Sequence, residues 1–232
     1  MQTIKISNID IDVSFKDIKN VHLSVHPPNG KVTVSAPLHI DLDTVKIYAA
    51  TKLSWIKKER SKILKQDRQS HKSYITRESH YLFGKRYLLE VTPASKAKVV
   101  AHHSKIELQV PQQFNAEDKH DLLYKFYRTE LRNKLTNLIS NYAKKMGLEP
   151  PDFGIRKMKT KWGSCSIERR HLWFNIELAK KPEACVEYII VHEMVHLLER
   201  HHNKNFTALV DRYYPNWQVQ KNILNELPLY HG

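Results

Sequence analysis

The residues with the clearest capacity for chemistry lie in the segment VHEMVHLLERHH, residues 191–202. His192 and His196 are separated by one helical turn, so a helix would place both imidazoles on one face with Cβ atoms about 5–6 Å apart. Two imidazoles at that separation can reach one metal ion, because Zn–N bonds are about 2.0–2.1 Å long. Glu193 is offset by one position and would face a water molecule on the metal. This spacing is the HExxH pattern of zinc hydrolases.

The chemistry that this pattern indicates is hydrolysis. A cation held by neutral imidazoles keeps a coordination position for water, and the pKa of that water falls toward about 7. Glu193 would take a proton from the water and return it to the leaving group. The same spacing also occurs on core helices whose histidines are satisfied by carbonyl oxygens. The apolar residues around His192 and His196 disfavour that interpretation, since two neighbouring buried imidazoles without a shared partner are costly.

A third protein ligand completes a catalytic zinc site. His202 is the candidate, because five residues separate it from the preceding histidine of the pattern, as in the metzincin sequence HExxHxxGxxH. Glu199 stands at the glycine position of that sequence, which weakens a metzincin assignment but leaves ligation by three histidines intact. The rival third ligands are His201 and Glu226. We expect one Zn²⁺ ion, or another divalent metal, to be held by His192, His196 and His202.

A basic segment precedes this region and carries Arg156, Lys159 and Lys161. These cations could hold an anionic substrate or stabilise an oxyanion, and the alternative is that they shield a strand edge from other chains. Asn175 is a fourth candidate substrate-binding residue. Cys165 has no CxxC partner, so we expect it to be structural.

Composition bounds the class of protein. The chain has 232 residues, and 38 Lys+Arg against 24 Asp+Glu give a formal charge of +14, which suits polyanionic partners. Hydrophobic residues make up 41%, as expected for a globular protein rather than a collagen-like or disordered one. No apolar run approaches the roughly 18 residues that a membrane span needs, and the start of the chain does not resemble a secretory signal. With two cysteines, we expect a reducing, cytoplasmic location and no membrane partner.

The periodicity of the apolar residues predicts an α+β protein without an internal repeat. We expect a β-rich region with one helix over residues 1–113, followed by an α+β hydrolase domain over residues 114–232. The first region should contain a hairpin around the PPNG turn, residues 27–30, and a helix over residues 41–65. The elements expected in the second region are a helix over 115–147, a half-buried strand over 171–178, a helix over 185–198, and two helices beginning after Asn203 and Asn216.

Several longer segments resemble the YgjP-like metal-dependent hydrolases, which are related to the SprT and WLM zinc metallopeptidases. The segments are KTKWGSCS (159–166), HLWFNIEL (171–178), YIIVHEMVHLLERHHNKNF (188–206) and YPNW (214–217). Upstream, the resemblance extends to HLSVHPPNGKVTVSAP (22–37), LSWIKKER (53–60) and FGKRYLLEV (83–91). The departures from the family pattern are Met194, Asn203 and Thr207, and none of them removes a ligand or the base. The resemblance implies a zincin-like, SprT-like domain and zinc-dependent hydrolysis.

Three functions remain open at this point. The first is a metallopeptidase that acts on peptides or proteins, with an extended substrate paired to an edge strand around residues 173–178. The second keeps the metal and hydrolyses nucleoside triphosphates, which the net charge would suit. The third is a nucleic-acid-binding module with a structural zinc, although structural sites are usually closed, four-ligand and rich in cysteine.

Overall fold

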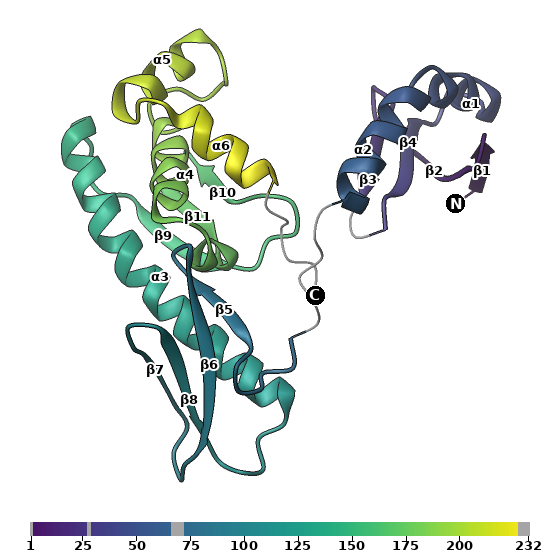
Figure 1. Ribbon diagram of the computed structural model, residues 1–232. Coiled ribbons are helices and arrows are strands. Elements are labelled where there is room, and N and C mark those ends of the chain that lie inside the picture. Colours follow the sequence, from purple (N-terminus) through teal and green to yellow (C-terminus); the bar gives the residue numbers. More distant parts are fainter. Residues whose placement is uncertain (1, 27–28, 66–71, 227–232) are drawn as a thin grey trace. The chain divides into compact units, whose positions relative to one another are not determined.

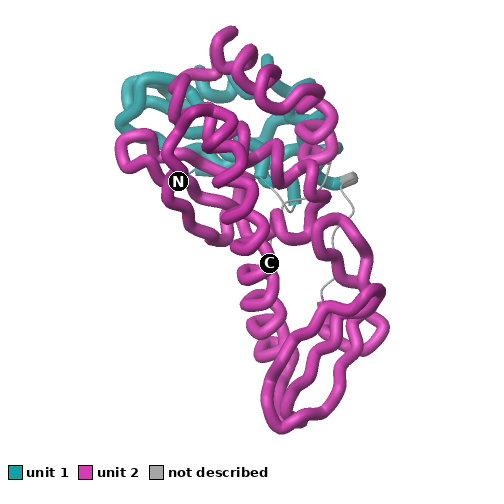
Figure 2. The backbone as a smooth tube through the Cα atoms, turned by 90° about the vertical axis from the view of Figure 1, so that its left-hand side faces the viewer, with its two compact units in different colours: residues 1–68, 231–232 teal, residues 69–230 magenta. Residues whose placement is uncertain are grey.

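The computed structural model describes residues 2–26, 29–65 and 72–226, and it confirms a mixed α+β fold (Figure 1). The chain divides into two compact units, one within residues 1–68 and the other within residues 69–230 (Figure 2). The boundary predicted near residue 113 falls inside the second unit, in the connection between its first sheet and its longest helix. None of the described helices is both long and apolar enough to cross a membrane.

The first unit is a four-stranded sheet with two helices. The strand order is β1-β2-β4-β3, and β2 and β4 are parallel whereas the two outer pairs are antiparallel. Its core is formed by alternate residues of the strands, such as Ile11 and Val32, and by residues of the helices, such as Val45 and Ile56. The elements are β1 (Gln2–Ile6), β2 (Ile9–Lys16), β3 (His22–His26), β4 (Lys31–Pro37), α1 (Leu42–Thr51) and α2 (Leu53–Lys65).

The single helix predicted over residues 41–65 was wrong, because the helix is interrupted at Lys52. The hydroxyl of Thr51, the last residue of α1, donates a hydrogen bond to the carbonyl of Tyr48 at 2.7 Å. Lys52 then takes φ −97° and ψ 6°, outside the helical range, and α2 begins at the next residue.

The second unit begins with a sheet of the same topology, so the prediction of no internal repeat was also wrong. The order β5-β6-β8-β7 again has a parallel central pair between two antiparallel ones. Ile11 faces Val32 in the first sheet as Leu89 faces Ile106 in the second. In both units the first two strands are joined by a two-residue turn with a residue at positive φ, Ser7 or Phe83. The strands are β5 (Ser79–Leu82), β6 (Lys85–Pro93), β7 (Lys98–Ala101) and β8 (Lys105–Val110).

A long helix, α3 (Ala116–Met146), connects this sheet to the remaining elements (Figure 1). Its ends were predicted correctly. Asn115 forms a capping box with Asp118, and Gly147 ends the helix with φ 66°, a conformation that glycine adopts without strain. The other elements are β9 (Asp152–Arg156), β10 (Gly163–Ser166), β11 (His171–Asn175), the 3₁₀ helix η1 (Ile176–Lys180), α4 (Glu183–Val195), α5 (Lys204–Tyr213) and α6 (Trp217–Glu226).

The strand order of the third sheet shows which of its strands lie at an edge. Its order is β10-β11-β9, so β11 is the central strand and both of its edges are paired. The prediction that residues 173–178 offer an edge to substrate was therefore wrong. The strand also ends at Asn175, because the side-chain oxygen of Asn175 accepts the backbone N–H of Glu177 at 3.2 Å and starts η1. The edge strands of this sheet are β10 and β9.

The turn between β5 and β6 packs against the start of α4. The backbone N–H of Phe83 donates to the carbonyl of Ala179 at 2.8 Å. Gly84 has φ +81°, and a Cβ on Gly84 would lie 2.9 Å from the Cα of Pro182, the residue before α4. The position therefore requires glycine for both its backbone conformation and its close contact.

We expect Gly84→Ala to lower the free energy of unfolding by about 2–4 kcal/mol, because it adds a backbone clash to an unfavourable φ. Gly147→Ala is the matched control, since Gly147 has φ +66° but a Cβ there would meet nothing within 4 Å. That control should lose only about 1 kcal/mol. Urea denaturation of both variants measures the difference, and equal losses would show that the contact with Pro182 is unimportant.

Candidate metal centre and active site

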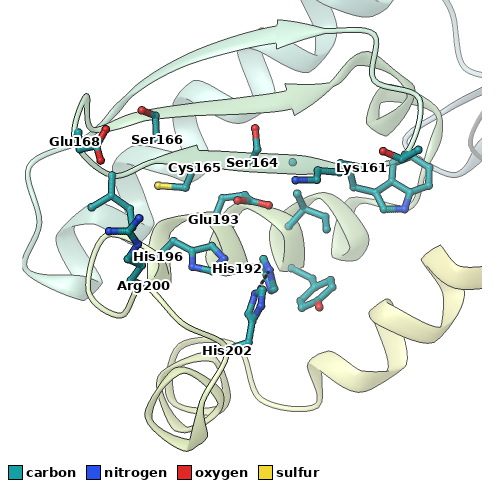
Figure 3. Close-up of a pocket in the computed structure, with 16 residues that line it drawn as sticks. Lys161, Ser164, Cys165, Ser166, Glu168, His192, Glu193, His196, Arg200 and His202 are labelled. Atoms are coloured by element: carbon teal, nitrogen blue, oxygen red, sulfur yellow. Dashed lines mark hydrogen bonds between the residues drawn. The ribbon is translucent and has the colours of Figure 1, made fainter. Parts of the chain in front are cut away.

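An open cleft of about 690 Å³ lies between β10 and α4 in the second unit (Figure 3). All four residues of β10 line one wall, and α4 supplies the other. The loop after α4 brings His202 to the same space. The residues that line the cleft are Thr160, Lys161, Trp162, Gly163, Ser164, Cys165, Ser166, Ile167, Glu168, Tyr188, Ile189, His192, Glu193, His196, Arg200 and His202.

Three imidazoles converge at this cleft, as the HExxH spacing and the third histidine predict. His192 lies in the last turn of α4 and His196 is its C-terminal cap, so both rings leave the same face of the helix. One ring nitrogen from each of His192, His196 and His202 lies within 4.8 Å of the others, and the Nε2 atoms of His192 and His202 are 3.2 Å apart. Two nitrogens on a tetrahedral zinc ion would be about 3.3 Å apart. The pair formed by His192 and His202 has this spacing, and the third nitrogen is near enough for all three side chains to be candidate ligands of one cation.

The loop between His196 and His202 turns back without a glycine. Among the described residues of this loop, none has positive φ, which explains why Glu199 is tolerated at the position where metzincins have glycine. The carbonyl of Glu199 lies 3.4 Å from Nδ1 of His196, an arrangement that keeps Nε2 of that ring for a metal. His201 is exposed and is not part of the converging group, and the side chain of Glu226 lies outside the described part of the chain.

Phe206 packs against all three imidazoles and does not line the cleft. Its ring centroid lies 5.0 Å from that of His192, 4.7 Å from that of His196 and 4.5 Å from that of His202. Phe206 is held in turn by Asn203, whose side-chain oxygen accepts the backbone N–H of Phe206 at 2.9 Å and begins α5. The cap that the sequence predicts at Asn203 thus also positions the apolar base of the site.

Electrostatics keeps these histidines in the form that binds metals. Burial, reinforced by the neighbouring imidazoles, lowers the pKa of His192 to about 4. The same causes lower the pKa of His196. Both rings are therefore neutral at neutral pH, and neutral imidazole is the state that coordinates a cation.

Glu193 is placed beside the triad and is only 4% exposed. Burial raises the pKa of this carboxyl to about 8, and the ammonium group of Lys161 opposes the shift. None of the described residues forms a hydrogen bond with it. Gly163, the first residue of β10, makes room for it, since a Cβ at that position would lie 2.7 Å from Oε1 of Glu193. The glycine of the WGSC motif is therefore explained by the carboxyl group that packs against it.

Of the four residues that the sequence predicted to bind substrate, the structure places only one in the cleft. Lys161 lines the cleft. Arg156 stacks its guanidinium 4.5 Å above the ring of Trp173, and Lys159 is exposed outside the cleft. Asn175 is fully buried, and its amide donates hydrogen bonds of 2.9 Å to the carbonyls of Met158 and Lys161.

Some cleft residues could not be selected from the sequence motif. Tyr188 precedes His192 by one helical turn, its ring contacts the imidazole edge-on at 5.9 Å, and it stacks on Trp217. The i, i+4 spacing on α4 was the available signal. Cys165 also lines the cleft, where burial and the nearby Glu193 raise its thiol pKa to about 11, so it is protonated at neutral pH.

Three imidazoles that converge beside a buried glutamate are typical of metal-dependent hydrolases with an HExxH helix. The sequence model of the YgjP-like metallopeptidase domain matches residues 19–227, so the chain belongs to the YgjP-like family and is a hydrolase of the metallopeptidase type.

Two solved structures are similar to part of this chain. The metallopeptidase zymogen abylysin of Pyrococcus abyssi is 19% identical, with a TM-score of 0.37, over 39% of this chain and 90% of that one. The metallopeptidase zymogen jannalysin of Methanocaldococcus jannaschii is 21% identical, with a TM-score of 0.35, and its match also covers 39% of this chain and 90% of that one. No curated protein matches the chain. The family assignment rests on the sequence match alone.

We expect Gly163→Ala to reduce hydrolysis about a hundredfold, because the new methyl group would displace the carboxyl of Glu193 and a shift of about 1 Å can have that effect. The metal content should not change, since no histidine of the triad is touched. Ser164→Ala, one residue along β10, is the control and should retain activity. A fully active Gly163→Ala variant would show that the position of Glu193 is not important for the reaction.

Proposed function

We propose that this protein is a metallopeptidase in which His192, His196 and His202 bind one catalytic cation and Glu193 is the general base. The observation that carries the proposal is the convergence of three imidazole nitrogens within 4.8 Å beside a buried carboxyl group without a hydrogen-bond partner among the described residues. A purely structural helix would leave this costly arrangement without a reason.

The donor set favours zinc, because borderline-soft imidazole nitrogens in a tetrahedral arrangement suit that ion. Other divalent first-row cations would also be accepted by the same ligands. When bound, the cation would polarise the carbonyl under attack and lower the pKa of a water molecule. A site with three protein ligands also differs from structural zinc sites, which have four, and this argues against the nucleic-acid-binding alternative.

Glu193 would move the protons. Its carboxylate would accept a proton from the attacking water, and the resulting carboxylic acid would donate that proton to the nitrogen of the leaving amine. Burial favours the protonated form of Glu193, whereas a cation at the histidines and the ammonium of Lys161 favour the carboxylate. These opposing influences suit a group that must be both base and acid in one cycle.

The wall formed by β10 supports a peptide as substrate. One edge of β10 pairs with β11, and its other edge borders the cleft. An extended peptide could add to that free edge through main-chain hydrogen bonds, which bind peptides without demanding a particular sequence. The nucleoside triphosphate and nucleic acid alternatives are supported by the net charge of +14, which does not select a reaction.

We expect Glu193→Gln to lose activity by at least about a hundredfold while retaining its metal, because glutamine keeps the shape of the side chain but cannot take the proton. A chelator should also abolish activity of the unmodified protein, and zinc should restore it. The measurements are metal content and cleavage of casein and of synthetic peptides.

Glu168→Gln is the matched control, since Glu168 lines the same cleft away from the triad. It should keep most of the activity. A Glu193→Gln variant that cleaves peptides at the normal rate would exclude Glu193 as the base. Release of pyrophosphate from nucleoside triphosphates without cleavage of any peptide would exclude the proposed substrate class.

A further inference from the structure

The two ends of the cleft differ, and the course of β10 along the cleft determines which residues lie at each end. The strand runs from Gly163, beside Glu193, to Ser166, and the chain then continues to Glu168. Figure 3 shows Lys161 at one end of the cleft, Glu168 and Arg200 at the other, and Glu193 between them. The general base therefore lies beside the first residue of the strand.

This direction orients a bound peptide. Antiparallel pairing is the more stable arrangement for a strand added to a free edge. A peptide antiparallel to β10 would have the residues before its scissile bond beside Ser166 and the residues after it beyond Gly163. Lys161 precedes Gly163 by two positions, which corresponds to about 6–7 Å along an extended chain. The first one or two residues of the leaving fragment would thus come within reach of Lys161.

Lys161 is a suitable receptor for a negative group at that end. Its side chain is exposed, lines the cleft and is directed toward Glu193, and among the described residues none forms an ion pair with its ammonium group (Figure 3). The acidic residues among those lining the cleft are Glu193 in the middle and Glu168 at the opposite end. The positive charge at the Lys161 end is therefore not neutralised by a cleft carboxylate of its own.

The main chain of Lys161 is held in place from behind. The buried amide of Asn175 donates 2.9 Å hydrogen bonds to the carbonyls of Lys161 and Met158, and the backbone N–H of Asn175 donates to the carbonyl of Trp162 at 2.9 Å. The ammonium of Lys181 lies 5.4 Å from the centre of the Trp162 ring. These contacts organise the segment before a substrate arrives, which reduces the entropy lost on binding.

We propose that Lys161 is a specificity-determining residue that binds a carboxylate located one or two residues after the scissile bond. This proposal rests on the proposed peptidase function. The carboxylate could be the C-terminus of the substrate itself, which would make the enzyme an exopeptidase, or the side chain of an aspartate or glutamate. In both cases a charge-assisted hydrogen bond joins an ammonium group to a carboxylate.

The test compares peptides that differ in one negative group. One pair ends two residues after the scissile bond in either a free carboxylate or an amide, and a second pair carries glutamate or glutamine there within a longer chain. We expect kcat/KM to be about tenfold higher for the acidic member of at least one pair, and the difference to shrink at high salt. The pair that shows the preference identifies the source of the carboxylate.

Lys161→Glu should abolish or reverse the preference, and Lys161→Gln should abolish it. Lys125→Glu, an exposed substitution on α3 with the same change in net charge, should leave it unchanged. Because each ratio compares two peptides on one variant, a general effect on Glu193 cancels. The dissociation constants of the same peptides for metal-loaded Glu193→Gln protein provide a readout that does not need turnover.

Unchanged ratios in Lys161→Glu would overturn the role of Lys161 while leaving the peptidase function intact. Equal cleavage of both members in both pairs by the unmodified protein would do the same. Failure of the metal-loaded protein to cleave any peptide would overturn the proposed function, and the role of Lys161 would fall with it.

Discussion

The close approach of three imidazoles to one buried glutamate is the constraint on which the rest of the second unit depends. The Nε2 atoms of His192 and His202 are 3.2 Å apart, and Glu193 is only 4% exposed, so its carboxyl group, which has no hydrogen-bond partner among the described residues, must be restrained by its surroundings. The apolar core around α4 supplies that restraint, since Ile190, Val191, Met194 and Val195 are fully buried on the helix that carries the ligands. Burial also lowers the pKa of His192 and of His196 and raises the pKa of Glu193.

Three smaller features complete this arrangement. Phe206, positioned by the Asn203 cap, packs against every ring of the triad. Gly163 lets β10 approach the carboxyl group of Glu193 more closely than any side chain would allow. Asn175 uses its buried amide to hold the segment that enters β10. The wall, the ligands and the base are thus fixed by contacts from four different elements, and the free edge of β10 gives the cleft its direction.

Much of the site followed from local patterns in the sequence. The HExxH spacing, the third histidine and the caps at Asn115, Asn203 and Gly147 are short-range features, and the structure contains them as expected. The order of strands in a sheet depends on contacts between distant segments, so the free edge was assigned to the wrong strand. The repeated four-strand topology was missed because few residue identities accompany the shared alternation of apolar residues, as in KVTVSAP (31–37) and KIELQVP (105–111). Asn175 was expected to bind substrate, and its complete burial could not be read from its neighbours in the sequence.

The most direct test of the central claim is X-ray absorption spectroscopy of the zinc-loaded protein. The account predicts a first shell with three imidazole nitrogens at about 2.0–2.1 Å, and the loss of one of them in His202→Ala. A first shell that contains sulfur, or one that is unchanged by His202→Ala, would contradict the assignment of His192, His196 and His202 as the ligands.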